Sequence, residues 1–387
     1  MPVPWFVWLL LAPLGALYAK LVALRRLLYR IGWKRTHRLG RPTVSVGNLT
    51  AGGAGKTPVV SWLLGETATL GLAAACLTRG YGRRTRSALS RVRAADGTPL
   101  DPVTLGDEAA LLAALHPSTP IFVGADRVAA ARLALLTDAP RLFVLDDGYQ
   151  HLRAARDLNV LLVDAQAGFG NGRLLPLGPL REPAREARRA DVVLITKANL
   201  GDAGVIAARL RALGVSVPVF RSDYRARELV RLDAWRAGAS VPLDAQSGAQ
   251  SGAQSRAQSG ALPTALPPQA LAGRRVGLLC GIARPEALRA TVAALGADVL
   301  QVEARSDHHA YPEADLARLG RLLADGPRGA PASDGPDWIT TEKDAIKLRG
   351  RLGAPERLWV LAMAAEPEAA AREFFVERLR VLLRRPD

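Results

Sequence analysis

Cysteine and aromatic residues are scarce in this chain of 387 residues. The two cysteines, Cys76 and Cys280, lie in separate apolar stretches, with no CxxC spacing and no histidine beside them. This pattern excludes a disulfide-built scaffold, argues against a zinc site and indicates a reducing compartment. Charged residues make up 23% and hydrophobic residues 49%, which excludes a wholly disordered chain. At about 150 residues per domain, the length favours two or three folded domains.

Acidic residues are also in the minority, since 36 Asp and Glu face 52 Lys and Arg and leave a formal charge of +16. Such a charge suits a nucleic acid, an anionic membrane surface or a phosphorylated substrate. Only six of the basic residues are lysines. Coding bias toward arginine therefore explains part of the positive excess as well as an anionic partner does. Basic and aromatic residues do not interleave as in a nucleic-acid module, and we expect no nucleic-acid partner.

The first 40 residues differ from the rest. No charge occurs from residue 3 to 19, and eight basic residues follow between Lys20 and Arg41. As a helix, the apolar run is at the short end of what crosses a bilayer. Tryptophan and tyrosine rings near its ends favour attachment to an anionic membrane, across it or in its interface, with the following chain on the cytoplasmic side. A buried core helix is the alternative, because Pro4 and Pro13 interrupt the run.

From residue 41 onward, short apolar runs alternate with amphipathic stretches. The first runs are 43–46, 73–77, 121–123, 142–145, 160–163, 192–195 and 215–220. Such alternation predicts a parallel sheet with helices on both faces, and we expect this α/β domain over 41–235. Residues 245–260 repeat a four-residue unit rich in Gln and Ser, so 236–270 is interpreted as a low-complexity linker or insertion. The alternation then resumes, which predicts a smaller C-terminal α/β domain over 271–387.

The first apolar run leads into a glycine-rich loop and then into a helical pattern. The loop reads Gly47-Asn48-Leu49-Thr50-Ala51-Gly52-Gly53-Ala54-Gly55-Lys56-Thr57-Pro58. Strand, loop and helix in this order are the context of a nucleotide-binding phosphate loop, although Thr50 stands where the motif has glycine. Backbone amides and Lys56 suit phosphate oxygens, and the Thr57 hydroxyl suits Mg²⁺. We predict nucleotide contacts from Asn48, Gly52, Gly53, Ala54, Gly55, Lys56 and Thr57.

The run 142–145 ends in Asp146 and Asp147, which places two carboxylates at the carboxyl edge of the predicted sheet. In a phosphate-loop fold, one such carboxylate holds Mg²⁺ and the other orders the nucleophile or its base; an ordinary turn before Gly148 is the alternative. Recognition of guanine needs an [NT]KxD sequence, and the matching position reads Thr196-Lys197-Ala198-Asn199. Because Asn cannot accept both hydrogen bonds from guanine, ATP is favoured over GTP.

Several further motifs occur in a fixed order. They are LTRGYGR at 77–83, GDE at 106–108, GADR at 124–127, LDDGYQH at 145–151, LREP at 180–183, DHHAY at 307–311 and TTEKDAIKL at 340–348. With the phosphate loop, they resemble the tetraacyldisaccharide 4'-kinase family of lipid A biosynthesis over nearly the whole chain. The resemblance implies a P-loop NTPase-like parallel sheet domain, a smaller α/β domain and an N-terminal membrane-associated helix.

The resemblance also implies an activity. The expected reaction transfers the γ-phosphate of ATP, with Mg²⁺, to the 4'-hydroxyl of a tetraacyldisaccharide 1-phosphate. The expected place is the cytoplasmic face of the bacterial inner membrane, with an anionic membrane surface as a partner and without an obligate protein partner. A phosphate-loop NTPase that drives a switch in a partner protein is the rival interpretation. The missing [NT]KxD, the absence of a Cys/His cluster and the apolar N-terminal run count against it.

Roles for individual residues follow from the same resemblance. Asp107 is expected as the base, with His308 as its partner; by its sequence context alone, Asp107 is a helix N-cap, and His308 and His309 are hard to separate. Lys56 and Asp147 complete the predicted catalytic set, and Thr57, Asp146 and Glu182 the Mg²⁺ set. Substrate contacts are expected from Arg79, Tyr81, Arg127, Gln150 and His151. Because Arg127 begins a helical pattern, its guanidinium and nearby amides are expected to hold an anion together.

Overall fold

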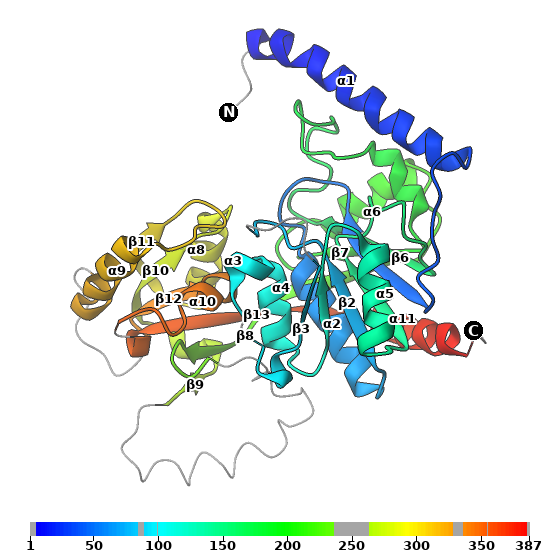
Figure 1. The fold of residues 1–387 in the computed structure, drawn as a ribbon. Helices are drawn as coiled ribbons and strands as arrows, with labels where there is room; N and C mark the ends of the chain where they lie inside the picture. The colour runs from blue at the N-terminus through cyan, green and yellow to red at the C-terminus, as the bar shows by residue number, and fades with distance from the viewer. Residues whose placement is uncertain are drawn as a thin grey trace.

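The computed structural model describes residues 5–83, 89–98, 100–235, 263–327, 336–353 and 355–384, with side chains from residue 11 onward. Within these residues, thirteen strands form one mostly parallel sheet, which confirms the predicted α/β class (Figure 1). The order is β11 (Asp298–Ala304), β10 (Arg275–Cys280), β12 (Trp338–Thr341), β13 (Leu358–Pro367), β8 (Val219–Arg231), β7 (Val192–Thr196), β6 (Leu158–Asp164), β1 (Thr43–Asn48), β5 (Leu142–Asp146), β2 (Ala74–Thr78), β4 (Ile121–Val123) and β3 (Ser90–Val92), while β9 (Ala265–Leu266) pairs with β8.

The central strands are buried along their whole length, because helices cover both faces of the sheet. Every residue of β1, β5, β6 and β7 is buried, and their sequences are rich in Val, Leu and Ile, as expected for parallel strands. The helices around this half are α2 (Lys56–Thr69), α3 (Pro102–Leu105), α4 (Asp107–Leu115), α5 (Arg127–Thr137), α6 (Ala203–Ala212) and α11 (Ala369–Leu383), with short 3₁₀ turns η1 (Ala94–Asp96) and η2 (Ala184–Arg189).

A second group of elements lies on the other side of β8 and β13, as Figure 1 shows. It contains β10, β11 and β12 with α8 (Pro285–Ala294), α9 (Glu313–Asp325), α10 (Glu342–Leu348) and the 3₁₀ turn η5 (Pro355–Arg357). The two groups share one hydrogen-bonded sheet, because β8 runs parallel to β7 and antiparallel to β13, and β13 runs parallel to β12. The strands of the two groups run in opposite directions along this ladder: β7 ends where Thr196 pairs with Ser222, and β12 ends where Thr341 pairs with Leu361, which pairs in turn with Leu229. The carboxyl ends of both groups therefore face the segment between these two points.

Strand β8 is longer and later than the predicted run 215–220. Its sequence VFRSDYRARELVR carries many charges, and its burial alternates along most of its length. Pairing with strands on both sides keeps this polar segment extended, whereas the sequence pattern alone shows only its apolar beginning. The position of β8 matters for function, because Tyr224 in the middle of the strand faces the cavity described below.

The predicted linker is shorter than expected. Residues 236–262 lie outside the described residues, but the segment that follows belongs to the fold. Strand β9 pairs Ala265 with Val230 and Leu266 with Leu229, and the 3₁₀ turn η4 (Pro268–Leu271) buries Leu271 completely. The prediction of a linker through residue 270 was therefore wrong at its C-terminal end. The proline-rich composition there gave no sign that this segment pairs with β8 and buries Leu271.

The N-terminal helix α1 (Trp5–Arg30) lies along one edge of the molecule (Figure 1). Its attachment is polar: the Tyr18 hydroxyl donates to the carbonyl of Arg181 over 2.9 Å, and Arg25 donates to the carbonyl of Gln150 over 2.9 Å. It is not a buried core helix, since Leu14, Leu17, Leu21, Leu24 and Leu27 are each 50 to 56% exposed. Among the described residues, no helix has both the length and the apolar character needed to span a membrane.

Candidate active site

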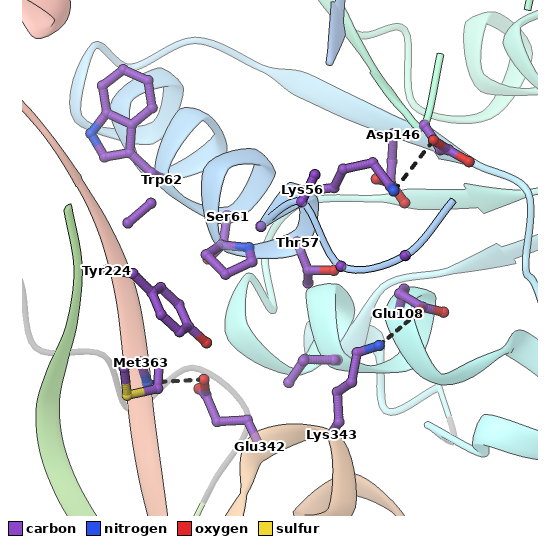
Figure 2. A pocket seen from close by; sticks show the side chains of 18 of the residues that line it. Lys56, Thr57, Ser61, Trp62, Glu108, Asp146, Tyr224, Glu342, Lys343 and Met363 are labelled. Carbon is purple, nitrogen blue, oxygen red and sulfur yellow. Dashed lines mark hydrogen bonds and ion pairs between the residues drawn. The ribbon is translucent and has the colours of Figure 1, made fainter. Parts of the chain in front are cut away.

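A cavity of about 1850 Å³ opens between the two groups of elements. One wall is the phosphate loop with the first turns of α2, which contribute Lys56, Thr57 and Trp62. The facing wall comes from β8, β13 and the start of α10, where Tyr224 and Met363 lie across from α2 and Lys343 points to Glu108 of α4 (Figure 2). Tyr18, Val22 and Arg25 of α1 complete the lining at one end. The cavity thus combines the predicted nucleotide loop with residues that are distant in the sequence.

The phosphate loop has the backbone shape that the sequence predicted. Gly55 precedes α2 with φ 74°, and Gly52 has φ 109°, both in the region that favours glycine. The amino group of Lys56 donates to Asn48 Oδ1 over 3.1 Å. Asn48 in turn donates to the carbonyl and the hydroxyl of Thr50, each over 2.9 Å. Thr50 therefore serves as a partner of Asn48, which gives a physical reason for a side chain at the position where the motif has glycine.

The other side of the loop is held by the segment that resembles a guanine motif. The Thr196 hydroxyl donates to the carbonyl of Ala54 over 3.0 Å, and Lys197 donates to the carbonyl of Gly53 over 3.0 Å. Both polar atoms of the Asn199 side-chain amide bond to the backbone of Tyr224, at 3.1 and 2.9 Å. These two bonds hold the Asn199 amide against the backbone of β8. Lys197 was missed by the sequence analysis, although it lies within the segment compared with the guanine motif.

The paired aspartates at the end of β5 have opposite electrostatic environments. Burial, together with the neighbouring charge of Asp147, raises the pKa of Asp146 to about 6, although its carboxylate accepts a hydrogen bond from Thr78 over 2.8 Å. Burial would also raise the pKa of Asp147, but Lys56 at 3.6 Å and Arg181 at 2.9 Å hold it below its ordinary value. The two carboxylates therefore differ in charge environment, and their division of work stays a prediction. Arg181 was missed, although it begins the REP part of a quoted motif.

Asp107 and His308 meet across the two groups of elements. Nδ1 of His308 lies 2.9 Å from Oδ2 of Asp107. Asp107 is the first residue of α4, and Gly106 occupies the N-cap position. The N-cap expectation was therefore wrong, and the carboxylate is available to His308. His309 is turned away, since its Nε2 lies 2.5 Å from Asp315 and its ring packs on Tyr311.

The positions of the carboxylate and the imidazole bear on the expectation that Asp107 is the base. Of the described residues, His308 lines the cavity whereas Asp107, which is 9% exposed, does not. Because a carboxylate only accepts hydrogen bonds, Nδ1 of His308 carries the proton in this pair, and Nε2 of the neutral ring is left as an acceptor. The hydrogen bond to Asp107 raises the pKa of His308, although burial opposes it. The imidazole thus stands between the carboxylate and the cavity.

Two lysines near this dyad were also missed. Lys347 lies 2.5 Å from Asp107 Oδ2, and Lys343 donates to Glu108 over 2.9 Å (Figure 2). Both belong to TTEKDAIKL, for which the sequence alone gave no role. Their spacing of four residues on a helix after a strand end was the available signal, because such residues share one helix face.

The predicted substrate residues separate into two groups. Arg79, Tyr81, Gln150 and His151 line the cavity, and the Tyr81 ring lies 5.5 Å from that of His308. Gln150 donates to the carbonyl of Asn48 over 2.8 Å and so ties this loop to the phosphate loop. Burial, assisted by the Arg127 charge, lowers the pKa of His151 to about 4, so this imidazole is neutral at pH 7.

Arg127 is placed differently from the expectation. Its guanidinium donates to the carbonyls of Gly124 and Ala125 over 3.1 and 3.2 Å. The first amides of α5 are capped by Asp126, which accepts from Val128 over 3.0 Å and from Ala129. The helix start is therefore not a free anion site, and the expectation of a joint amide and guanidinium site was wrong. Arg127 lines the cavity, where burial lowers its pKa.

Glu182 lines the α1 end of the cavity, but its carboxylate is already engaged. It forms an ion pair with Arg189, and burial raises its pKa. Thr57 and Asp146 remain as the Mg²⁺ candidates, and both lie beside Lys56 in Figure 2. No group of three or more His, Cys, Asp or Glu side chains suited to a metal ion occurs in the described part of the chain.

Comparisons with known proteins agree with this geometry. The family model described as "Tetraacyldisaccharide-1-P 4'-kinase" matches residues 7–380. A "Tetraacyldisaccharide 4'-kinase" of Syntrophus aciditrophicus is 33% identical over 96% of this chain and 93% of its own length. A relative of the same name from Anaeromyxobacter sp. is 38% identical over 92% of this chain and 88% of its own length.

A solved structure is similar over the same extent. The crystal structure of LpxK from Aquifex aeolicus in complex with ATP superposes with a TM-score of 0.71 at 27% identity, and the match covers 96% of this chain and 98% of that one. Sequence, fold and site geometry lead to one conclusion: the chain belongs to the tetraacyldisaccharide-1-P 4'-kinase family.

Proposed function

We propose that the cavity transfers the γ-phosphate of ATP to the 4'-hydroxyl of a tetraacyldisaccharide 1-phosphate in lipid A biosynthesis. One observation carries this assignment: in a chain of this kinase family, one cavity is lined by a phosphate loop and by the imidazole of a carboxylate–imidazole dyad. The loop suits a triphosphate, and the dyad suits removal of a proton from a hydroxyl. The ATP in the similar crystal structure supports the choice of nucleotide.

The phosphate loop positions the donor. Lys56 supplies a positive charge among the loop amides, and Asn48 and Asp147 hold its amino group from either side. Arg181, bound to Asp147, brings a second cation to the same place. Because the transition state of phosphoryl transfer is loose, fixed positive charge around the transferred group is the main requirement. These residues meet that requirement without taking part in covalent chemistry.

The donor set at the loop fits a Mg²⁺ ion. Asp146 is 5% exposed, and the pKa raised to about 6 shows that its charge lacks a sufficient counter-charge in the protein alone. Mg²⁺ in such sites takes one or two carboxylates, a hydroxyl and substrate phosphates, so a larger carboxylate cluster is unnecessary. Thr57 and Asp146 would hold the ion, which when bound neutralises charge that develops on the phosphates.

The dyad accepts the proton of the acceptor. As the 4'-oxygen forms its bond to the γ-phosphorus, the bond from that phosphorus to the bridging oxygen of ADP breaks, and the hydroxyl proton passes to Nε2 of His308. Asp107 stabilises the resulting imidazolium through Nδ1. The raised pKa of His308 makes its ring a stronger base. Tyr81, Arg79, Gln150 and His151 lie around the same space and are proposed to contact the acceptor.

Helix α1 is proposed to bring the cavity to its lipid. Tyr18, Val22 and Arg25 line the cavity, while the outward leucines of the same helix are half exposed. Leucines on one surface and a basic segment after them suit the interface of an anionic membrane. We place this contact at the cytoplasmic face of the bacterial inner membrane. The headgroup of a membrane-embedded disaccharide would then reach the cavity while its acyl chains stay in lipid.

A transfer assay tests this function. Detergent-solubilised protein is incubated with γ-labelled ATP, Mg²⁺ and the lipid disaccharide 1-phosphate, and the site of label is determined by mass spectrometry. We expect label at the 4' position of the lipid, and none with the Lys56→Met variant. Phosphate release that is independent of the lipid and responds to a protein partner would contradict the proposal.

A further inference from the structure

Helix α10 reaches the dyad with two lysines. Lys343 and Lys347 are four residues apart on this helix and bind consecutive acids of α4, at 2.9 Å from Glu108 and 2.5 Å from Asp107. The acids lie in the first turn of α4, where the helix dipole favours negative charge. The two ion pairs therefore join the second group of elements to the first beside the reacting centre. Their environments differ, and the difference suggests different roles.

Lys347 is the buried member of the pair. Its side chain is 5% exposed, against 31% for Lys343, and Asp107 is its one ion-pair partner among the described residues. The neighbouring Asp344 is already bonded by Tyr311, Thr341 and the amide of Gly281, at 2.9, 2.7 and 3.0 Å. Those bonds fix α10 in place. The ammonium of Lys347 is thus held against Asp107 by the fold itself.

The contact is made to one particular oxygen. Lys347 Nζ and His308 Nδ1 both approach Oδ2 of Asp107, at 2.5 and 2.9 Å. Burial would raise the pKa of Asp107, but the hydrogen bond from His308 and the charge of Lys347 hold it below its ordinary value. The other charged groups near the dyad are Glu108, Asp307 and Lys343, so Lys347 is the cation that touches the carboxylate itself.

We propose that Lys347 is a positioning residue of the transfer reaction, whose ammonium fixes Asp107 Oδ2 so that the carboxylate remains charged and presents His308 to the acceptor hydroxyl. This inference rests on the proposed function. Lys347 does not line the cavity, so it acts on the reaction through Asp107 and not on the substrate. If Lys347 had only a structural role, it would simply keep α4 and α10 together. The ion pair of Lys343 with Glu108 would serve that purpose equally well.

The pH profile of kcat/KM separates the two roles. Loss of the cation in Lys347→Met makes protonation of the dyad easier, whichever of its two groups takes the proton. The acidic limb of the profile is therefore expected to move toward higher pH by about one unit or more. At neutral pH this appears as a fall in kcat with little change in the KM for ATP. Lys347→Arg keeps the charge, and its acidic limb is expected to stay near that of the wild type.

Lys343→Met is the matched control, since it removes a lysine from the same face of α10 one turn away. We expect its acidic limb to move in the same direction but clearly less than that of Lys347→Met, because Lys343 acts on His308 only through its charge and pairs with Glu108, whatever its effect on the KM for the lipid. An unmoved limb in Lys347→Met, or equal shifts in the Met variants of both lysines, would overturn the proposal. Lys347→Gln carries the same test if the Met variant does not fold. If neither folds while Lys347→Arg does, the charge serves the fold and the proposal fails.

The same assays keep this inference separate from the proposed function. Wild-type protein that labels no lipid refutes the function before any variant is compared. Wild-type protein that labels the lipid, with a Lys347→Met variant whose acidic limb is unmoved, leaves the function standing and refutes the role of Lys347 alone.

Discussion

Two walls of the cavity are built in different ways. The phosphate-loop wall is local: Asn48, Gly55 and Lys56 lie within one strand–loop–helix segment, and the start of α2 fixes their geometry. The dyad wall presents His308 to the cavity, with Asp107 and Lys347 behind it, and these three residues come from three segments far apart in the chain. A local wall depends on backbone conformation, whereas an assembled wall depends on packing between elements. Variants in the two walls should therefore fail in different ways.

The largest effect is expected in the local wall. Lys56→Met removes the cation nearest the phosphates and leaves Asp147 with Arg181. Fixed charge of this kind contributes several kcal/mol, so we expect transfer to fall about 10³-fold or more, with weaker ATP binding. The measurements are the lipid-labelling rate and the dissociation constant for ATP by calorimetry. Lys197→Met is the comparison, because Lys197 supports the loop through the carbonyl of Gly53 and should give a smaller loss.

The assembled wall should lose the chemical step but keep the nucleotide. His308→Gln removes the proposed proton acceptor, and we expect kcat to fall about 10²- to 10³-fold while ATP affinity stays near that of the wild type. His309→Gln is the matched control, because the imidazole of His309 is adjacent in the sequence but binds Asp315 instead of Asp107. The kcat of each variant is compared with its ATP dissociation constant. Equal losses of kcat in the two histidine variants would contradict the role of the dyad. They would show that the conformation of the segment carrying both histidines limits the reaction.

This contrast also explains what the sequence alone could predict. The phosphate loop, the paired aspartates and the α/β alternation depend on neighbouring residues, so their patterns are visible before folding. For Asp107 and His308, the family resemblance supplied a pairing that spacing could not. Lys347 was not found, because nothing in a seven-residue helix shows which acid of another element it will meet.

The failures of prediction have the same origin. Arg127 was expected to hold an anion, but Asp126 caps the helix and the guanidinium bonds to carbonyls of its own loop. Strand β8 was recognised only at its apolar start, because pairing with β13 keeps its charged remainder extended. In each case, tertiary contacts supplied partners that composition and periodicity cannot specify.

Helix α1 lines one end of the cavity as a third wall. Variants in this helix are expected to affect vesicle binding by less than the dyad variants affect kcat. Leu17→Gln combined with Leu21→Gln removes two half-exposed leucines from the proposed membrane surface. At about 1 kcal/mol for each, binding to anionic phospholipid vesicles should weaken about 30-fold, as measured by co-sedimentation. Leu136→Gln is the control, because Leu136 is 85% exposed but lies on α5. Transfer to a detergent-dispersed acceptor should change much less than vesicle binding, and a parallel loss of both would contradict this role for α1.

The smallest effect on transfer is expected for a buried acid of the assembled wall, whose charge affects the stability of the fold instead. Glu342 accepts a hydrogen bond from the amide of Met363 over 3.2 Å (Figure 2), and burial raises its pKa to about 7 from an ordinary 4.5. The folded protein therefore binds this proton more tightly than the unfolded chain does. The resulting stability is complete below about pH 4.5 and is lost as the pH rises through 7.

Glu342→Gln keeps an acceptor for the Met363 amide but removes the titration. Relative to the wild type, its free energy of unfolding should rise by about 3 kcal/mol at pH 8 and show no gain near pH 4.5, as measured by urea denaturation across pH. Glu366→Gln, at an exposed acid of β13, should give no such trend. A constant difference at every pH would mean that the carboxylate is already stabilised in place.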